Sequence, residues 1–423
     1  MKRLFPFVFV LGVLAVVSFS HKRFFKKTYS IDEDTGISLP PGFSAVVVAD
    51  KLGPARHIVV NDNADVYVKL EELNENRGIL RLRDANKDGV AEDILGFGDY
   101  TGTGIAIKNG YLYASSNSKV YRYKLENNEV INKNNPELII TGLVDKRQHA
   151  SKSIVLDNSG NIYVNIGAPS NSCQERDRRE GSPGMNPCPI LDSAGGIWQF
   201  RADKLNQSYK EGIRYATGLR NIVGLDWNTR VNDLYAVMHG RDDLDRLYPH
   251  LYTVDQRAEL PAEEMFRIKK GGDYGWPYCY FDHLQNKKVQ SPEYGGDGKK
   301  TTGCEAKEKP IYAFPAHWGP NALLFYTGSQ FPAKYKDGAF IAFHGSWNRA
   351  PREQAGYNVV FLPFKDGKPA GDFEVFADGF AGENKTPQGA KYRPCGLAQG
   401  PDGSLYISDD QQGRIWKIIY KGN

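Results

Sequence analysis

The chain has 423 residues, and its 54 Lys+Arg against 50 Asp+Glu give a formal net charge of +4. This near balance argues against a nucleic-acid-binding protein, which typically carries a concentrated basic excess. Hydrophobic residues make up 40% of the chain and aromatic residues 12%, enough to build a core and to exclude a wholly disordered chain.

Residues 1–20 are typical of an export signal. Lys2 and Arg3 precede an almost wholly apolar run from Leu4 to Phe19, and a small residue, Ser20, precedes the expected cut. An uncleaved anchor is the alternative, because the basic cluster at 21–27 resists translocation. We therefore expect a periplasmic or secreted protein, with a membrane tether if the signal is retained, and a linker over residues 21–37.

A short phrase recurs six times: a polar turn and then a strand that carries tyrosine or another aromatic residue. The copies lie at 62–70, 108–116, 157–167, 232–240, 336–345 and 401–410. An alternating strand accompanies each copy, which is the period of a half-buried strand. Six such units predict an all-β fold, a six-bladed β-propeller over residues 38–423, with 42–49 closing the ring on the last blade. A pair of β-sandwiches is the alternative.

Three long stretches interrupt the repeat, at 169–195, 241–263 and 277–332. Insertions of this kind are expected in the loops of one face of a propeller, the top face, where binding sites lie. They contain Cys173, Cys188, Cys279 and Cys304. Since export permits disulfides, pairing of sequence neighbours (Cys173 with Cys188, Cys279 with Cys304) would close two loops and leave Cys395 free. A metal site is the alternative, without CxxC or HxxxH spacing to support it.

His149 lies just before a phrase that we expect to form an inner strand, where its side chain would point to the top of the central channel. A histidine can accept a proton near neutral pH, although an isolated one is more often structural. His57, His239 and His344 occupy analogous places in other blades.

Basic residues fall near similar blade positions. They are Arg56, Arg220 with Asn221 beside it, Arg241, Arg349, Lys391 and Arg393. Arg220 and Arg393 are embedded among apolar or small residues, where a charge needs a partner. Convergence of these side chains would imply an anionic ligand such as a polycarboxylate cofactor, because guanidinium groups form forked hydrogen bonds with carboxylates.

The segment 84–93 is a separate motif. Asp84, Asn86 and Asp88 alternate ahead of Gly89, like the first half of a calcium loop. Val90 would contribute its carbonyl, and Glu92 or Asp93 would complete the shell. The glutamate expected at the twelfth position is missing, so a plain polar turn remains the alternative.

Several stretches resemble the PQQ-dependent sugar dehydrogenases, in particular the sorbosone/pyranosone dehydrogenase branch. The resemblance covers about residues 38–420, and its most specific parts are GGDYGWPYC (271–279) and HGSWNR (344–349). It implies a propeller that binds PQQ and Ca²⁺ and oxidises a sugar or sugar aldehyde by hydride transfer to the quinone. Electrons would pass to an external acceptor, a quinone or a cytochrome.

The same resemblance implies roles for individual residues. His149 would be the general base, and Gly240 and Arg241 would bind the catalytic Ca²⁺ through their backbone carbonyls. Cofactor contacts would come from the basic set with Asn221, namely Arg56, Arg220, Arg349, Lys391 and Arg393. Gln148 departs from the pattern, because soluble glucose dehydrogenases carry aspartate there; a ketoaldose or aldose-like substrate is therefore expected rather than glucose. A non-catalytic carbohydrate-binding propeller and a metal-dependent lactonase-type propeller are the alternatives.

Overall fold

The computed structural model describes residues 35–422. The predicted signal at 1–20 and most of the predicted linker at 21–37 lie outside the described residues. Within the described range, no helix is both long and apolar enough to span a membrane.

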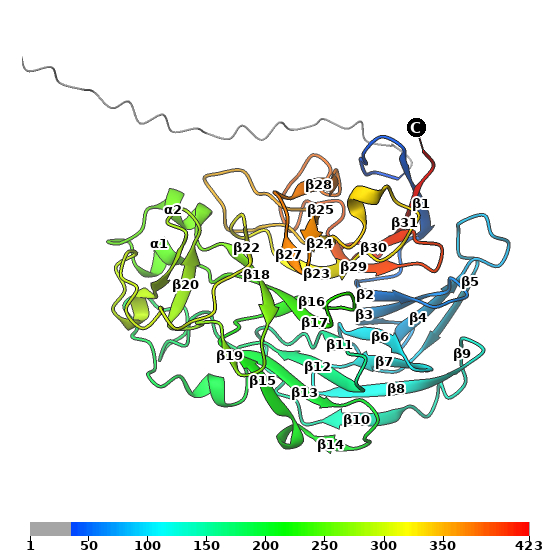
Figure 1. Ribbon diagram of the computed structural model, residues 1–423, viewed down its shortest axis with the longest axis horizontal. Coiled ribbons are helices and arrows are strands. Elements are labelled where there is room, and N and C mark those ends of the chain that lie inside the picture. Colours follow the sequence, from blue (N-terminus) through cyan, green and yellow to red (C-terminus); the bar gives the residue numbers. More distant parts are fainter. Residues whose placement is uncertain (1–34, 423) are drawn as a thin grey trace, which may run out of the picture.

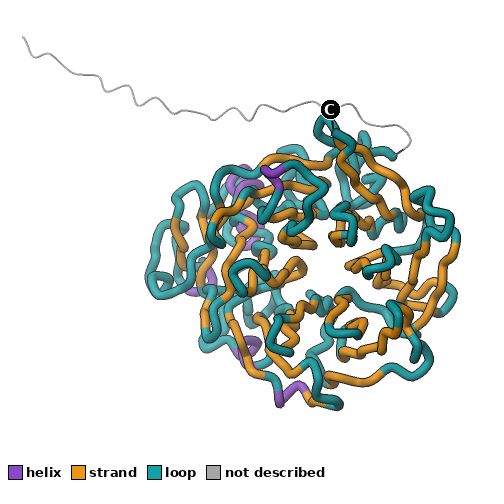
Figure 2. Tube along the Cα trace, turned by 45° about the vertical axis from the view of Figure 1, so that its right-hand side comes forward, coloured by secondary structure: helices purple, strands orange, loops and turns teal. Residues whose placement is uncertain are grey.

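Six of the eight sheets in the described residues are each built on four antiparallel strands and form a ring, as the sequence predicts (Figures 1 and 2); the other two are short two-stranded sheets. The first blade contains β2 (Ala55–Val60), β3 (Val66–Asn74), β4 (Arg77–Arg83) and β5 (Asp93–Phe97). The second contains β6 (Ile105–Lys108), β7 (Tyr111–Ser115), β8 (Lys119–Glu126) and β10 (Glu137–Thr141). The third contains β11 (Ile154–Leu156), β12 (Asn161–Ile166), β13 (Gly196–Arg201) and β15 (Ile213–Thr217).

The remaining blades have the same order. The fourth contains β16 (Ile222–Asn228), β17 (Asp233–Met238), β18 (Glu263–Ile268) and β22 (Tyr312–Phe314). The fifth contains β23 (Pro320–Phe325), β24 (Ala339–Phe343), β25 (Asn358–Leu362) and β28 (Glu374–Ala377). The sixth contains β29 (Pro394–Gln399), β30 (Leu405–Asp409), β31 (Ile415–Tyr420) and β1 (Phe43–Ala49).

Short elements occupy the connections. They are β9 (Glu129–Val130), β14 (Gln207–Ser208), β19 (Gly272–Asp273), β20 (Cys279–Asp282), β21 (Lys287–Gln290), β26 (Phe364–Lys365) and β27 (Lys368–Pro369). The α-helices are α1 (Leu244–Leu247) and α2 (Val254–Glu259). The 3₁₀ turns are η1 (Pro189–Asp192), η2 (Tyr209–Glu211), η3 (Pro292–Tyr294) and η4 (Ala333–Tyr335).

The ring closes as predicted. Strand β1 pairs antiparallel with β31, from Phe43 opposite Tyr420 to Ala49 opposite Ile415. The first strands of the blades, β2, β6, β11, β16, β23 and β29, each contact the first strands of both neighbouring blades. They therefore form the inner wall around the axis.

The recurring phrase is the second strand of each blade, together with the turn that precedes it, and not the inner strand as expected. The turn explains the recurrence, because its first polar side chain bonds the backbone ahead. Asp157 accepts hydrogen bonds from the amides of Ser159 and Asn161, and Asn61 does so from Asn63 and Asp65. The true inner strands are as short as three residues in β11, too short for an alternating pattern to be recognised.

The predicted insertions at 169–195 and 241–263 lie in loops between blade strands, the second reaching the first residue of β18. The third, 277–332, extends too far: it includes β22 and β23, which are regular blade strands. Strand β23 has mostly buried side chains along its whole length, so it lacks the alternation that marks a half-buried strand.

The hydrophobic core lies between adjacent blades. One cluster, for example, joins Tyr113 and Val120 of the second blade to Ile154 and Trp198 of the third. Each blade therefore buries apolar side chains against both of its neighbours, and polar groups are presented by the loops.

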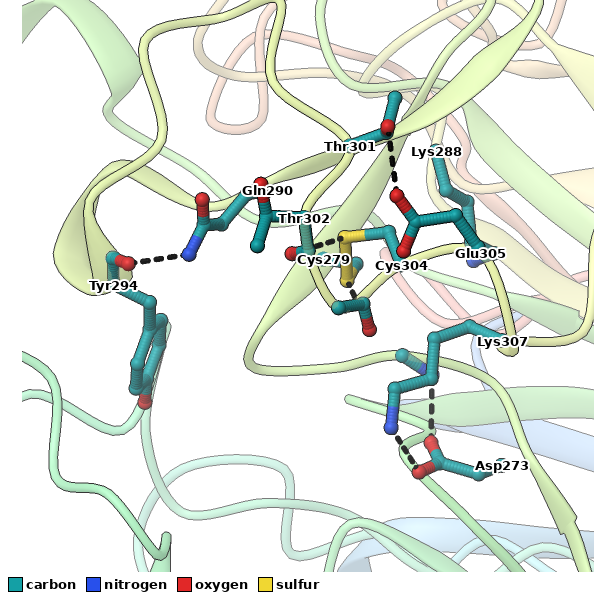
Figure 3. Close-up of a disulfide and its surroundings, with 12 residues drawn as sticks. Asp273, Cys279, Lys288, Gln290, Tyr294, Thr301, Thr302, Cys304, Glu305 and Lys307 are labelled. Atoms are coloured by element: carbon teal, nitrogen blue, oxygen red, sulfur yellow. Dashed lines mark hydrogen bonds and ion pairs between the residues drawn. A yellow bond between two sulfur atoms is a disulfide. The ribbon is translucent and has the colours of Figure 1, made fainter.

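Both predicted disulfides are present. Cys173 bonds to Cys188 and Cys279 to Cys304, while Cys395 is buried without a disulfide. Figure 3 shows the second disulfide, which ties β20 to a loop held by the ion pair between Lys307 and Asp273. Together with α1 and α2, this region forms a lobe beside the ring (Figure 1).

Candidate functional site

A cavity of about 260 Å³ opens at one end of the ring. Several of its lining residues stand where first strands begin, such as Arg220 before β16 and Arg393 before β29, or where second strands end, such as His239 after β17 and His344 after β24. In an antiparallel sheet these two kinds of position lie at the same end. The full lining is His149, Arg178, Arg220, His239, Gly240, Asp242, Glu263, His317, Gly319, His344, Gly345, Trp347, Asn348 and Arg393.

His149 is held in one tautomer. Its Nδ1 is hydrogen-bonded to the carbonyl oxygen of Ala168, so Nδ1 carries the proton and Nε2 keeps its lone pair. Burial, and then the positive charge of Arg220, lowers the pKa of His149 to about 3. The imidazole is therefore neutral at neutral pH, with Nε2 available to accept a proton.

Asp242 is the centre of the charge network in the cavity. Its carboxylate accepts hydrogen bonds from Arg178 at 2.9 Å, Arg220 at 3.0 Å and Asn348 at 2.8 Å. Burial alone would raise the pKa of Asp242, but Arg220 and Arg178 hold it below its ordinary value. One carboxylate thus orients two guanidinium groups, of which Arg178 also pairs with Asp243.

Asn171 fixes Arg220 from the other side. The Arg220 Nε donates to the Asn171 carbonyl oxygen at 3.2 Å, and Nη2 donates to the Asn171 side-chain oxygen at 3.1 Å. The Asn171 amide also donates to the carbonyl of Asp242, and its carbonyl accepts a bond from the Trp276 indole. Since Asn171 is fully buried, the orientation of Arg220 is set before any ligand binds.

Glu263 contributes a second carboxylate to the cavity wall. It is 2% exposed and accepts hydrogen bonds from the backbone amides of Gly240 at 2.8 Å and Gly319 at 3.1 Å. Burial raises its pKa to about 7. The contact joins the loop after β17 to the loop before β23, so it fixes the cavity wall across two blades.

The three other histidines predicted at blade ends, His57, His239 and His344, each bond to a carbonyl or carboxylate oxygen. His239 bonds through Nε2 to the carbonyl of Pro320, and burial lowers its pKa to about 4. His344 pairs with Asp410, which also accepts a hydrogen bond from Arg56 at 2.6 Å. Arg56 is thus buried behind the lining and does not face the cavity; His57 bonds to the carbonyl of Asn321.

The predicted basic set divides in the structure. Arg220 and Arg393 line the cavity. Arg393 donates hydrogen bonds from Nε and Nη2 to the backbone carbonyls of His344 and Gly345. Arg349 turns away, donating to the carbonyls of Ala258 and Ala316. Lys391 is exposed beside the Tyr392 ring and is not among the lining residues.

Asn221 lies near His149 but is not among the residues that line the cavity. A Cβ built on Gly167 would stand 2.6 Å from the His149 Cβ and 2.8 Å from the Asn221 side-chain oxygen, so only glycine fits between them. That oxygen is buried without a hydrogen-bond partner in the described chain. An unsatisfied buried acceptor is costly, which makes it a natural partner for a ligand donor.

Gly240 lines the cavity, whereas the Arg241 side chain points into the lobe and pairs with Glu293 at 2.5 Å. The predicted calcium loop is elsewhere, between β4 and β5 in the first blade. There the carboxylates of Asp84, Asp88 and Glu92 offer atoms within 4.8 Å of one another. Asn86 bonds to Asp88, and Val90 is 46% exposed.

Several lining residues escaped the sequence analysis. Arg178 lies in the charged run ERDRRE, which is indistinguishable from a solvated loop, and Glu263 begins an ordinary strand. Asp242 had one detectable signal, because a buried arginine such as Arg220 requires a nearby carboxylate. Trp347 is 55% exposed and lines the cavity. It lies within HGSWNR (344–349), one of the stretches that carry the resemblance to the sugar dehydrogenases.

Comparison with known proteins agrees with this fold. An iodide structure of the Trichoderma reesei Carbohydrate-Active Enzymes Family AA12 superposes with a TM-score of 0.72 at 21% identity, covering 91% of this chain and 97% of that one. The holo form of the pyranose dehydrogenase PQQ domain from Coprinopsis cinerea gives 0.72 at 20% identity, covering 90% and 97%. At these identities the likeness establishes the fold alone.

Sequence relatives extend the comparison. An uncharacterized protein of Borreliella burgdorferi is 27% identical over 330 residues, 75% of each chain. A pyrroloquinoline quinone-dependent pyranose dehydrogenase of Coprinopsis cinerea is 25% identical over 56% of this chain, a match that spans only 36% of that enzyme. The TrAA12-like family model matches residues 37–421. The chain therefore belongs to the TrAA12-like family and is related to the PQQ-dependent sugar dehydrogenases.

Proposed function

We propose that this protein is a PQQ- and calcium-dependent dehydrogenase that oxidises an aldose or ketoaldose and passes the electrons to an external quinone or cytochrome. The observation that carries the proposal is the joint placement of His149, with Nε2 unprotonated, and the guanidinium groups of Arg220 and Arg393 in one cavity. A base beside a cationic pocket suits proton abstraction next to an anionic cofactor.

The residues present fit PQQ. The cofactor is a tricarboxylate, and the cavity holds Arg178, Arg220 and Arg393 against the carboxylates of Asp242 and Glu263. Arg393 Nη1 makes no hydrogen bond within the described residues, and the Asn221 oxygen is an unsatisfied acceptor. Arg220 and Arg393 are the lining residues that would hold PQQ, whereas Asn221 is buried outside the lining. When bound, PQQ would supply a two-electron hydride acceptor.

The site also suits a hard divalent cation. Gly240 lies beside Glu263 and Asp242 in the lining, and Ca²⁺ prefers carboxylate and backbone carbonyl oxygens. We propose the Gly240 and Arg241 carbonyls as ligands. The loop at Asp84, Asn86, Asp88, Val90 and Glu92 remains a proposal for a second, structural calcium.

His149 would perform the proton step. Its Nε2 would take the proton of the sugar hydroxyl, whose carbon would become a carbonyl on giving up its hydride to the acceptor that PQQ would supply. The Ala168 carbonyl holds Nδ1–H in place and stabilises the imidazolium that forms. Burial lowers the pKa of His149 most, and the positive charge of Arg220 lowers it further. An anionic ligand near Arg220 would offset that charge and raise the pKa of His149 toward the range that a base requires.

The two carboxylates of the lining do not favour a lactonase-type hydrolase. Asp242 is already bonded to two guanidinium groups, and Glu263 to two backbone amides. The two disulfides support export to an oxidising compartment, and we propose a periplasmic or secreted location.

The decisive experiment is reconstitution. Full-length protein is titrated with PQQ, with and without Ca²⁺, and followed by the quinone absorbance; dye reduction with a panel of aldoses and ketoaldoses is then measured. We expect saturable PQQ binding. We also expect dye reduction only when Ca²⁺ is present. No absorbance change would favour a non-catalytic sugar-binding propeller, and lactone hydrolysis without dye reduction would overturn the oxidoreductase assignment.

A further inference from the structure

A second depression adjoins the central cavity and shares a wall with it. It has a volume of about 590 Å³ and is lined by Arg178, Arg179, Glu180, Gly181, Arg246 and Leu247; Arg178 also lines the central cavity. We call it the arginine groove. The central cavity, at about 260 Å³, is smaller than most small-molecule sites of about 300–1,000 Å³. A bound cofactor would therefore fill much of it, and the substrate would extend into the adjoining groove.

The turn that forms the groove is built rigidly. Gln174, only 3% exposed, accepts a hydrogen bond from the Arg178 amide and donates to the carbonyls of Arg179 and Ser182, each at 3.0 Å. The Cys173–Cys188 disulfide closes the same loop. The two arginines are therefore presented on a pre-formed scaffold, which reduces the ordering cost of ligand binding.

The charges of the groove are unevenly satisfied. Arg178 pairs with Asp242 and Asp243, and Arg246 pairs with Asp243 at 2.7 Å. Arg179 is exposed and makes no ion pair or side-chain hydrogen bond within residues 35–422. Glu180 is the only carboxylate in the lining, so Arg179 is the cation of the groove that is left for a ligand.

We propose that the arginine groove binds the carboxylate of an acidic saccharide, a uronic acid unit, with Arg179 as its principal contact. A guanidinium forms paired hydrogen bonds with a carboxylate, whereas a neutral sugar would gain only single bonds there. Glu180 would accept hydrogen bonds from sugar hydroxyls. An acidic saccharide would be the substrate class of the proposed dehydrogenase. Its oxidation rests on that proposed function, whereas its binding to the groove does not.

The test measures binding to the cofactor-free full chain. D-Glucuronate and D-glucose have the same ring and differ by a carboxylate in place of a hydroxymethyl group. By titration calorimetry we expect glucuronate to bind at least about tenfold more tightly, the scale of one charge-assisted hydrogen bond. The preference should weaken as ionic strength rises to about 0.15 M.

Two variants give the matched comparison. Arg179→Gln should reduce glucuronate binding about tenfold. Arg176→Gln removes an exposed charge from the same turn without touching the groove lining, so glucuronate should bind it as it binds the wild type. Equal loss in both variants would reduce the effect to general surface charge and overturn the proposal.

The outcomes separate this inference from the proposed function. Equal affinity for glucuronate and glucose, with PQQ reconstitution intact, would refute the acidic substrate and leave the dehydrogenase standing. Preferential glucuronate binding that is lost in Arg179→Gln, without PQQ binding, would support the groove and contradict the proposed dehydrogenase. If Arg179→Gln altered only electron transfer to an acidic acceptor protein, the groove would be a docking surface and the saccharide proposal would be wrong.

Discussion

The loop at 84–92 and the central cavity both gather carboxylates, but they are built in opposite ways. In the loop, Asp84 accepts hydrogen bonds from the amides of Asp88 and Gly89, and Glu92 from the amide of Ala85. All partners are sequence neighbours and the loop is largely exposed. In the cavity, Asp242 binds Arg178, Arg220 and Asn348, which come from the third, fourth and fifth blades.

This difference decides how much each cluster matters to stability. Exposed charges are screened and stay hydrated when one partner is lost. Buried charges have no water to replace a lost partner, so removal of one leaves an uncompensated charge in a medium of low dielectric constant. The cavity is therefore part of the fold, whereas the loop is an addition to its surface.

The largest predicted effect is on stability. Asp242→Ala should reduce the free energy of unfolding by about 3–5 kcal/mol, because it leaves Arg178 and Arg220 facing each other without their shared carboxylate. Urea unfolding followed by tryptophan fluorescence measures this change. A loss as small as that caused by Asp88→Ala in the loop would contradict the contrast between the two regions.

A second prediction separates the proton-accepting role proposed for His149 from the binding of PQQ. His149→Ala should lower turnover by about 10²–10⁴-fold, the usual contribution of a general base, while PQQ titration stays close to that of the wild type. Arg220 keeps its bonds to Asn171 and Asp242 in this variant, since none passes through His149. Turnover at the wild-type rate would remove His149 from the mechanism.

Local patterns allowed much of the fold to be predicted. The turn formed by Asp157 repeats because its hydrogen bonds lie within four residues, and the disulfides join cysteines of the same loop. The role of Asp242 could not be predicted this way, because its partners are 22 to 106 residues distant. Its neighbours in the sequence, RDDLD, resemble any solvated charged run.

Lys391 and Arg393 show the same limit at close range. The sequence places both near similar blade positions, and the family resemblance implies that both contact the cofactor. The strand β29 begins only at Pro394, and Tyr392 packs against Trp416 with ring centroids 5.1 Å apart. Tyr392 is thus buried between the two basic residues, with Arg393 in the cavity lining and Lys391 at the surface.

A third prediction uses this pair as its own control. Arg393→Ala should weaken PQQ binding by about 1.5–3 kcal/mol, the value of a hydrogen bond to a charged group. Lys391→Ala should leave the PQQ titration unchanged, since Lys391 is outside the cavity lining. Equal weakening by both variants, measured by quinone absorbance, would place Lys391 at the cofactor and contradict this assignment.

The smallest predicted effect tests the loop itself. In calcium-free buffer Asp88→Ala should change the free energy of unfolding by at most about 1 kcal/mol, because it loses only exposed bonds to Val90 and Asn86. Added Ca²⁺ should raise the melting temperature of the PQQ-free wild type more than that of the variant, since cation binding stabilises the folded state. The Glu263→Gln variant changes the cavity instead of the loop. It should keep the part of the Ca²⁺-induced rise in melting temperature that comes from the loop. A calcium response that survives Asp88→Ala but not Glu263→Gln would mean that the loop is a plain polar turn, and that the cavity holds the calcium of this molecule.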